Sequence, residues 1–459
     1  MKVEEYINFF GTPQSKDLIL KAMSTGSGSG GPLIEQHYET VITNKAIRLN
    51  PYLAVPEYQY DPQKYHRFTR RTALPPPGSA MGELGYAPDR SATREEVIKT
   101  LKVLQRRGGV SGFVRAATKK NYDAERIELE DHIEAFANDL AIYYLYGNSA
   151  ADQYCFDGLD FFIATNRDNA ALGGVVPTDM SVLDNMIDQS RSKKSQGHRV
   201  VFSMSPFMLR KLSRLWTNVR DQRPAVRDNS EDIYIDGGFR LRTYDGYPII
   251  EGSQTRPIEQ MGAVVYSDAG AGAAIPNDTR YFRVAPITWD GEQIASTEVN
   301  GTSSSADTIT LTWAANEKAM LYKIYAADTT NLEKLVKVIS GFTYDGNGTP
   351  TGNVTSHTFT SEPLTPDPLS APTHMQNDLP LSYVGGIAPE IIHLWDLDKH
   401  QGLGKIAHTN DLGTELEGFL GIDKLGRTRN ATDFLLFTYM AMIDSYEATS
   451  AIYRGVRTA

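Results

Sequence analysis

The spacing of apolar residues changes several times along this chain, and each change predicts a different kind of structure. The clearest pattern covers residues 122–146, where apolar positions recur with a helical period and Gly147 follows as a stop. At about 1.5 Å per residue this segment makes a rod of roughly 37 Å, longer than the usual helix of a compact domain. The predicted buried stripe consists of Leu129, Ile133, Phe136, Ala137, Leu140 and Tyr144.

Residues 178–257 alternate between helical and extended patterns. One helix is predicted to begin near Thr178, and a second follows a short apolar strand with Pro206 at its first position. The dipeptide Asp245-Gly246 then predicts a tight turn between two further strands. This segment is therefore expected to form a mixed α+β unit.

From residue 285 onward apolar and polar residues alternate strictly, and Thr, Ser, Gly and Asn become frequent. Short alternating runs separated by Gly and Pro predict a small all-β sandwich over residues 285–370. Trp313 and Tyr322 are its expected core residues. The chain then returns to mixed structure, and its late apolar run 434–443 is expected to rejoin the sheet of the mixed unit.

The N-terminal part shows fewer signs of a core. Residues 1–36 combine one short predicted helix with a Gly- and Ser-rich stretch, so they are expected to form an arm. Residues 60–108 place a Pro- and Gly-rich tip between two basic limbs, which is typical of a projecting loop. Within that loop Thr93 and Glu96 form a capping box, and the apolar spacing predicts a helix over residues 94–106.

The composition excludes several classes of protein. The chain has 459 residues, 41% of them hydrophobic and 22% charged, which is typical of a folded protein with several domains. Its formal net charge of −10 argues against a protein that mainly coats nucleic acid, since such proteins carry clustered Lys and Arg. No apolar run has the length of a signal peptide core or a membrane span, so we expect folding in a cytosol and no membrane partner.

The search for catalytic or metal-binding chemistry finds little. Cys155 is the only cysteine, so an intramolecular disulfide and a cysteine zinc site are excluded, and a buried structural thiol is expected. Asp396, Asp398 and His400 could hold a divalent metal, but solvated charges are the favoured interpretation. No catalytic elbow, phosphate loop or metalloprotease helix occurs. We therefore predict no enzyme activity, no catalytic residue, no cofactor and no metal.

The basic limbs of the loop allow two interpretations. Aromatic residues among them could stack on nucleic-acid bases. The favoured alternative is a contact between subunits, in which the basic loop docks on acidic side chains of a neighbour's long helix. The candidate contact residues are Arg67, Arg70, Arg71, Arg94, Glu128, Asp131 and Glu134.

Several segments also resemble one known family. They are Gly147-Asn148-Ser149 with Phe156-Asp157-Gly158-Leu159 after the long helix, the helix-opening segment 200–206, the segment 245–251, and the run 434–457 that closes on Tyr453-Arg454-Gly455-Val456-Arg457. In this order they resemble the major capsid proteins of tailed bacteriophages, which have the Hong Kong 97-like fold.

The resemblance implies an α+β fold with an N-terminal arm, an extended loop, a spine helix, and peripheral and axial domains. It divides this sequence into an arm 1–36, a peripheral domain 37–177 with extended loop 60–108 and spine helix 122–146, an axial domain 178–284, an inserted sandwich 285–370, and a return to the axial and peripheral core 371–459. The sandwich resembles an immunoglobulin or fibronectin type III module. The family makes residues 94–106 an extended strand, and there we follow the family against the helical pattern.

The function implied by the resemblance is that of a virion structural protein. Identical subunits would form hexamers and pentamers and close an icosahedral shell around double-stranded DNA, which lies on the inner face without sequence-specific contacts. A portal is a further expected partner. The arm is too short to include a fused scaffolding segment, so a separate scaffolding protein is expected if one is needed. Assembly would take place in the cytoplasm of a bacterial host, with the sandwich displayed outward and dispensable for the core fold.

Two other classes of function stay open on the sequence alone. A carbohydrate-binding or adhesion protein could use Trp289, Trp313 and Tyr344 to stack on sugar. A hydrolase with an accessory β module would need a catalytic group of residues, which the sequence does not show.

Overall fold

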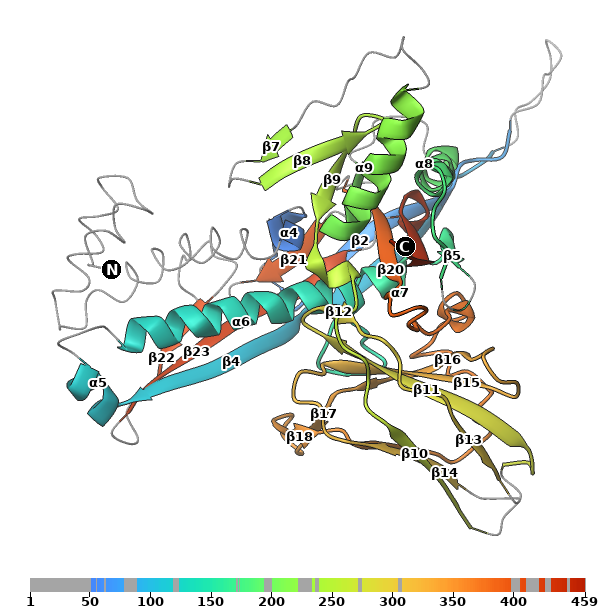
Figure 1. Ribbon diagram of the computed structural model, residues 1–459. Helices are drawn as coiled ribbons and strands as arrows, with labels where there is room; N and C mark the ends of the chain where they lie inside the picture. The colour runs from blue at the N-terminus through green and yellow to red at the C-terminus, as the bar shows by residue number, and fades with distance from the viewer. Residues whose placement is uncertain are drawn as a thin grey trace, which may run out of the picture.

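The computed structural model describes most of residues 51–458. Within this range it does not describe residues 55, 62, 78–88, 119–123, 171, 173, 194–199, 222–232, 236–238, 271–274, 304–307, 398–404, 410–420, 426–430 and 444–445. The predicted arm 1–36 and the metal candidates Asp398 and His400 lie outside the described residues. The described chain forms three units that meet at one place (Figure 1).

The first unit is a seven-stranded mixed sheet flanked by two helices. Its elements are β5 (Arg167–Asn169), α8 (Ser181–Lys193), β6 (Val200–Met204), α9 (Pro206–Asp221), β7 (Ile233–Ile235), β8 (Phe239–Tyr244), β9 (Tyr247–Glu251), β20 (Glu390–Asp396) and β24 (Ala451–Val456). Along the sheet the order is β5-β24-β20-β6-β9-β8-β7. The predicted start of α9 at Pro206 is confirmed, and Asp245 and Gly246 take the positive φ angles of a tight hairpin turn.

The two helices attach to this sheet through their apolar faces. Met186 of α8 and Met208 and Leu212 of α9 share one buried cluster with Phe202 of β6. Because β6 and β20 are buried along their whole length, the unit has a core of its own. The predicted mixed α+β unit is therefore present.

The second unit is a sheet that carries the long helix. Its elements are α4 (Pro51–Ala54), β1 (Glu57–Tyr60), β4 (Lys102–Ser111), α5 (Gly112–Thr118), α6 (Ala124–Tyr146), α7 (Leu159–Phe162), β21 (Lys405–Thr409), β22 (Gly421–Lys424) and β23 (Ala431–Ile443). Helix α6 runs along the ladder formed by β4 and β23 (Figure 1). The predicted helix and its stripe are confirmed, since all of the stripe residues from Leu129 to Tyr144 are buried.

The late apolar run 434–443 does not rejoin the sheet of the mixed unit, so that prediction is wrong. It belongs to β23, which pairs antiparallel with β4 from Ala431 to Met440 and packs beneath α6. The return to the seven-stranded sheet is made instead by β20 and β24. An apolar run identifies a buried strand, but the neighbours of that strand are chosen by tertiary packing.

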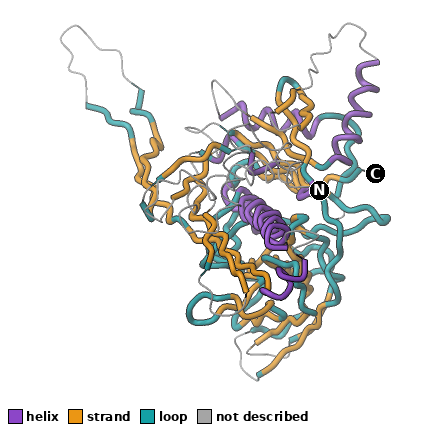
Figure 2. Tube along the Cα trace, turned by 90° about the vertical axis from the view of Figure 1, so that its left-hand side faces the viewer, coloured by secondary structure: helices purple, strands orange, loops and turns teal. Residues whose placement is uncertain are grey.

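A two-stranded hairpin leaves the second unit near its junction with the other two. It consists of β2 (Tyr65–Ala73) and β3 (Thr93–Thr100), which pair antiparallel, and it stands clear of the rest of the chain (Figure 2). The helix that the capping box predicts for residues 94–106 is absent, because this segment forms β3 and the first part of β4. Cross-strand pairing of β3 with β2 and of β4 with β23 outweighs the local helical preference. The extended form implied by the family is confirmed.

The third unit is a β-sandwich. One sheet contains β10 (Val264–Ala269), β14 (Thr308–Trp313) and β19 (Ser356–Phe359), and the other contains β11 (Thr279–Thr288), β12 (Gly291–Glu292), β13 (Val299–Thr302), β15 (Leu321–Ala327) and β16 (Lys334–Ser340). The small ladder of β17 (Phe342–Tyr344) and β18 (Pro350–Asn353) lies beside them. Trp313 and Tyr322 are buried core residues, as predicted, with ring centroids 5.2 Å apart. The predicted start at residue 285 is too late, because β10 and β11 supply strands to both sheets.

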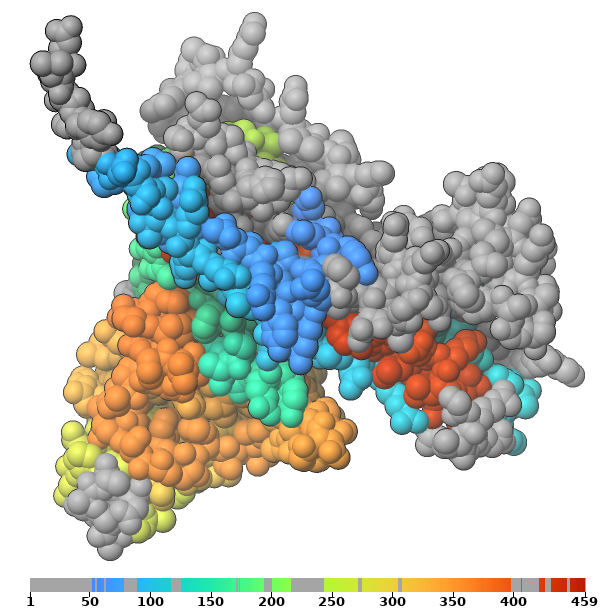
Figure 3. Space-filling view, turned by 180° about the vertical axis from the view of Figure 1, so that it is seen from behind, coloured from blue at the N-terminus to red at the C-terminus, as the bar shows by residue number. Residues whose placement is uncertain are grey.

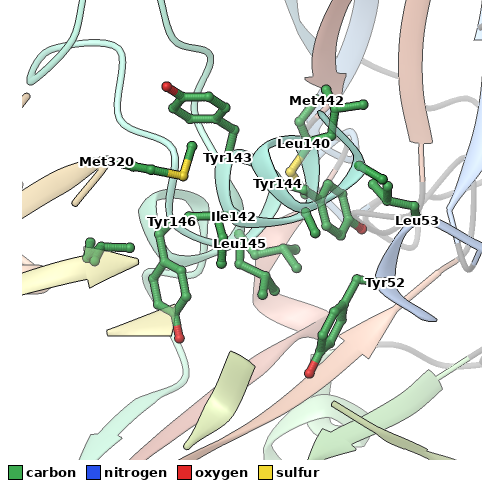
Figure 4. Close-up of a cluster of buried hydrophobic side chains, with 14 of the residues drawn as sticks. Tyr52, Leu53, Leu140, Ile142, Tyr143, Tyr144, Leu145, Tyr146, Met320 and Met442 are labelled. Carbon is green, nitrogen blue, oxygen red and sulfur yellow. The ribbon is translucent and has the colours of Figure 1, made fainter. Parts of the chain in front are cut away.

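The sandwich has a buried cluster of its own around Trp313 and Tyr322, and it also shares a second cluster with the long helix. Its residues Ile287, Ile294, Met320 and Leu321 belong to the same buried cluster as α6, and Met320 lies beside Tyr143 in Figure 4. The connecting turns η1 (Ser253–Thr255), η2 (Met375–Asn377) and η3 (Glu447–Thr449) carry further buried residues. Removing the sandwich would expose this shared apolar surface. This shared surface argues against the expectation that the sandwich is dispensable for the core fold, which stays a prediction.

One glycine lets the sandwich pack closely on the turn η1. Gly291, the first residue of β12, has a φ of +82°, and a Cβ added there would lie 1.9 Å from the carbonyl oxygen of Gln254 in η1. Gly291→Ala should lower the free energy of unfolding by about 2–4 kcal/mol, from a strained backbone and a clash together. Gly246→Ala is the matched control, with the same φ and open space around the added methyl. It should cost only about 1 kcal/mol in urea unfolding. Equal losses would contradict the proposed close packing.

Candidate subunit-contact surfaces

The hairpin formed by β2 and β3 has little support within its own chain. Its base is held by Phe68, which packs near Leu101, and by Lys99, whose Nζ lies 4.4 Å from the centroid of the Phe162 ring. Beyond the base both strands are largely exposed, and apolar Ile98 and Leu74 are 50% and 67% exposed. A two-stranded hairpin of this kind is marginally stable alone, so it needs a surface to lie on.

The basic residues of the hairpin are only partly neutralised. Arg70 pairs with Glu95 on the opposite strand at 3.1 Å. Arg71 lies directly across from Arg94, so two like charges face each other on one rung of the ladder. Like charges directly opposite each other destabilise a β pair. Within the described chain neither of these two arginines, nor Arg67, takes part in an ion pair, so all three can engage an acidic partner.

The acidic candidates lie on the N-terminal half of α6. Glu128 accepts a hydrogen bond from the ring of His132 at 3.1 Å. Asp131 is exposed and Glu134 is half-buried, and no ion pair involves either carboxylate among the residues that the structure describes. Since the other face of the helix is fixed on the β4–β23 ladder, these carboxylates are held in place on a rigid element.

The structure does not bring the two sets of candidate residues together in one subunit. The hairpin leaves the junction of the three units on one side, whereas the acidic half of α6 runs out on the other side toward α5 (Figure 1). Seen from behind, the blue surface that contains the hairpin extends to the upper left, whereas the red surface of the C-terminal part lies toward the lower right (Figure 3). A contact between these surfaces therefore requires two copies of the chain.

A polar cluster beneath α6, which the sequence did not reveal, fixes the helix. Asp139 accepts a hydrogen bond from Arg106 of β4 at 2.9 Å and another from the indole of Trp289 at 2.7 Å. Burial raises the pKa of Asp139, and Arg106 and Trp289 oppose that shift. The Arg106 Nε also donates to His132 at 3.2 Å. The cluster connects α6, β4 and the sandwich. Its residues are so far apart in the sequence that their spacing could not predict the contact.

The aromatic residues considered for sugar binding already have partners within the chain, although Trp289 is 40% exposed. Trp313 is 4% exposed in the sandwich core, and the indole N–H of Trp289 is occupied by Asp139. The Tyr344 hydroxyl donates to Asp152 at 2.5 Å, and its ring packs on Tyr154 at 4.8 Å. These three residues do not form a shared flat surface on which a sugar ring could stack. The carbohydrate-binding alternative is therefore not favoured.

The remaining chemical candidates are structural where they are described. Cys155 is buried as predicted, and burial raises the pKa of its thiol well above the ordinary range. Asp396 is buried at the end of β20. Among the described residues no group of three His, Cys, Asp or Glu side chains is arranged to hold a metal ion. None of the described helices is long and apolar enough to cross a membrane.

A buried carboxyl at the start of β20 gives the fold a pH dependence. The Ser205 hydroxyl, which caps α9 by accepting from the Met208 amide at 3.1 Å, donates to Glu390. Arg256 lies 3.7 Å away from the Glu390 carboxyl, too far to offset burial. Burial raises the pKa of Glu390 to about 7, although Ser205 and Arg256 act in the opposite direction.

A raised pKa means that folding favours protonated Glu390. Its stabilising contribution is complete below the pKa of the unfolded chain and is lost as the pH rises through about 7. The free energy of unfolding should fall between pH 5 and pH 8, and Glu390→Gln should lessen this fall by on the order of 3 kcal/mol. Thermal unfolding across this range is the measurement, with exposed Glu251→Gln as the control. An unchanged pH profile in Glu390→Gln would contradict the assignment.

Comparisons with known proteins give matches only among solved structures. No family model matches the chain, and no curated protein does. The chain is similar to the holo-SrpI encapsulin of Synechococcus elongatus PCC 7942, at 10% identity and a TM-score of 0.41, over 89% of this chain and 87% of that one. It is also similar to the capsid of the native GTA particle, at 9% identity, a TM-score of 0.40 and 90% of each chain. The Cyanophage A-1(L) capsid gives 12% identity and a TM-score of 0.40 over 89% of this chain and 93% of that one.

Proposed function

We propose that this chain is a shell-forming subunit, the major capsid protein of a tailed bacterial virus. The single observation that carries the proposal is the separation of two complementary surfaces. A basic hairpin that is held at its base lies on one side of the subunit. On the other side the N-terminal half of α6 carries Asp131 and Glu134, which form no ion pair among the described residues. Within the part of the chain that the structure describes the two surfaces do not meet, and their charges are complementary.

The position of these surfaces determines the kind of assembly. Because they are different patches, the contact is heterologous and runs head to tail from copy to copy. Heterologous contacts close into rings when the rotation between neighbours closes. Hexamers and pentamers are such rings, and together they close an icosahedral shell. The charged contact sets the register between copies, and the exposed Ile98 and Leu74 supply apolar area to bury.

The other partners follow from the same proposal. Double-stranded DNA would fill the shell, and a chain with a net charge of −10 suits non-specific confinement better than tight phosphate binding. A portal and a separate scaffolding protein would complete the assembly in the cytoplasm of a bacterial host. No catalytic step is assigned to the chain.

The first experiment asks whether the chain forms shells. The purified full-length protein is analysed by size-exclusion chromatography with light scattering and by electron microscopy. Closed particles of megadalton mass are expected. A monodisperse monomer under all assembly conditions would overturn the proposal.

The second experiment tests the contact itself. Arg67→Glu/Arg71→Glu should leave the subunit folded, because both side chains are exposed, and should reduce the yield of closed shells about tenfold or more through like-charge repulsion. Adding Asp131→Lys/Glu134→Lys on α6 should restore assembly, since the two charges are then exchanged. Lys318→Glu/Lys334→Glu on the sandwich is the control with the same change in net charge. Failure of the α6 substitutions to rescue would remove this pairing from the model of assembly.

A further inference from the structure

Charged side chains form a buried ring where the three units meet. All of the members are within the interior, with at most 3% of any side chain exposed. They are Asp160 of α7, Arg167 of β5, Glu292 of β12, Lys323 of β15, Asp378 after η2, and Arg454 of β24. Three are acidic and three are basic, so the ring carries no net charge.

The contacts alternate in charge around a closed circuit. Arg167 donates to Asp160 at 2.7 Å and to Asp378 at 2.7 Å. Lys323 donates to Asp160 at 2.8 Å and to Glu292 at 2.7 Å. Arg454 makes two hydrogen bonds to Glu292, at 2.7 and 2.9 Å, and its Nε lies 3.6 Å from Asp378. Each member therefore has an oppositely charged neighbour on both sides.

The opposite charges in the ring favour the ionised forms of its carboxylates Asp160 and Glu292. Burial alone would raise the pKa of Asp160, but Arg167 and Lys323 hold it well below the ordinary value. Burial likewise opposes ionisation of Glu292, and Arg454 and Lys323 lower its pKa to about 2. Removing one member leaves an uncompensated buried charge, whereas removing an oppositely charged pair keeps the balance.

The members of the ring come from all three units. Asp160 follows the long helix, Arg167 and Arg454 belong to the seven-stranded sheet, and Glu292 and Lys323 belong to the sandwich. Apolar surfaces between units are non-directional and tolerate small rotations. Charge-assisted hydrogen bonds with fixed partners have a required geometry and do not. The ring therefore defines one angle between the units where apolar contact alone would allow several.

We propose that this ring is the joint that fixes the curvature of the subunit, and through it the uniform size of the shell. The inference rests on the proposed function, because curvature matters only in a closed assembly. It also gives the sandwich a role in assembly, since the sandwich supplies Lys323 and Glu292 to the joint. A small change in the angle of every subunit would be repeated around the shell and would change its diameter.

The test compares full-length variants that differ in charge balance. Asp160→Asn/Lys323→Met keeps the balance but removes the link between α7 and the sandwich. Lys323→Met alone leaves an uncompensated negative charge. Lys318→Met is the matched control, because that lysine forms an exposed ion pair with Glu259 on the same sandwich. The measurements are the thermal unfolding midpoint of unassembled subunits and the distribution of particle diameters by electron microscopy.

Each outcome bears on the proposal. We expect Lys318→Met to behave as wild type, Lys323→Met to lower the unfolding midpoint the most, and the double variant to fold yet give particles of mixed diameter. Uniform wild-type diameters in the double variant would overturn the joint while leaving the shell function intact. An unfolded double variant, or an unaffected Lys323→Met, would overturn the charge-balance argument. If the wild type forms no shells, the proposed function itself fails, and the role in curvature fails with it.

Discussion

The burial of the C-terminal end of α6 is the constraint on which the rest of the structure depends. Residues 141–146 are buried on every side of the helix, so no face is left for solvent. Trp395 of the seven-stranded sheet packs on Tyr144, Met442 of β23 approaches from the second unit, and Met320 comes from the sandwich (Figure 4). A helix end that is apolar all round has to be enclosed. Three units enclose it here, and none can be removed without exposing it.

Apolar enclosure and the ionic ring make different contributions at this junction. The aromatic and aliphatic side chains around α6 supply most of the driving force for bringing the units together, because that force scales with buried apolar area. The ring determines the orientation of the units, since its hydrogen bonds and ion pairs require one arrangement of their partners. Buried charges of this kind are weak evidence for stability but can specify a unique geometry. In the proposed shell, where one subunit is repeated many times, that uniqueness would be required.

The centre of the molecule is densely packed, whereas its two ends contribute few residues to a core. The junction has a dense core. The hairpin on one side and α5 on the other bury few apolar side chains, and Phe113 of α5 is 79% exposed. In a protein that acts as a monomer, we would expect such segments to pack against the protein's own core. Their outward placement, one basic and one next to acidic side chains, is what the proposed contact between neighbouring copies requires.

The sequence by itself determined the elements whose signals are local. The period of apolar residues predicted α6 and its stripe, Pro206 marked the start of α9, Asp245-Gly246 marked a hairpin turn, and strict alternation marked the sandwich strands. Tertiary structure decided everything that depends on partners distant in the chain. Residues 94–106 form strands despite their capping box, and β23 pairs with β4. The sandwich begins before residue 285, and Asp160 forms an ion pair with Lys323. The reason is physical: backbone propensity acts over a few residues, whereas cross-strand pairing and charge compensation in a low-dielectric interior act between residues that only the fold brings together.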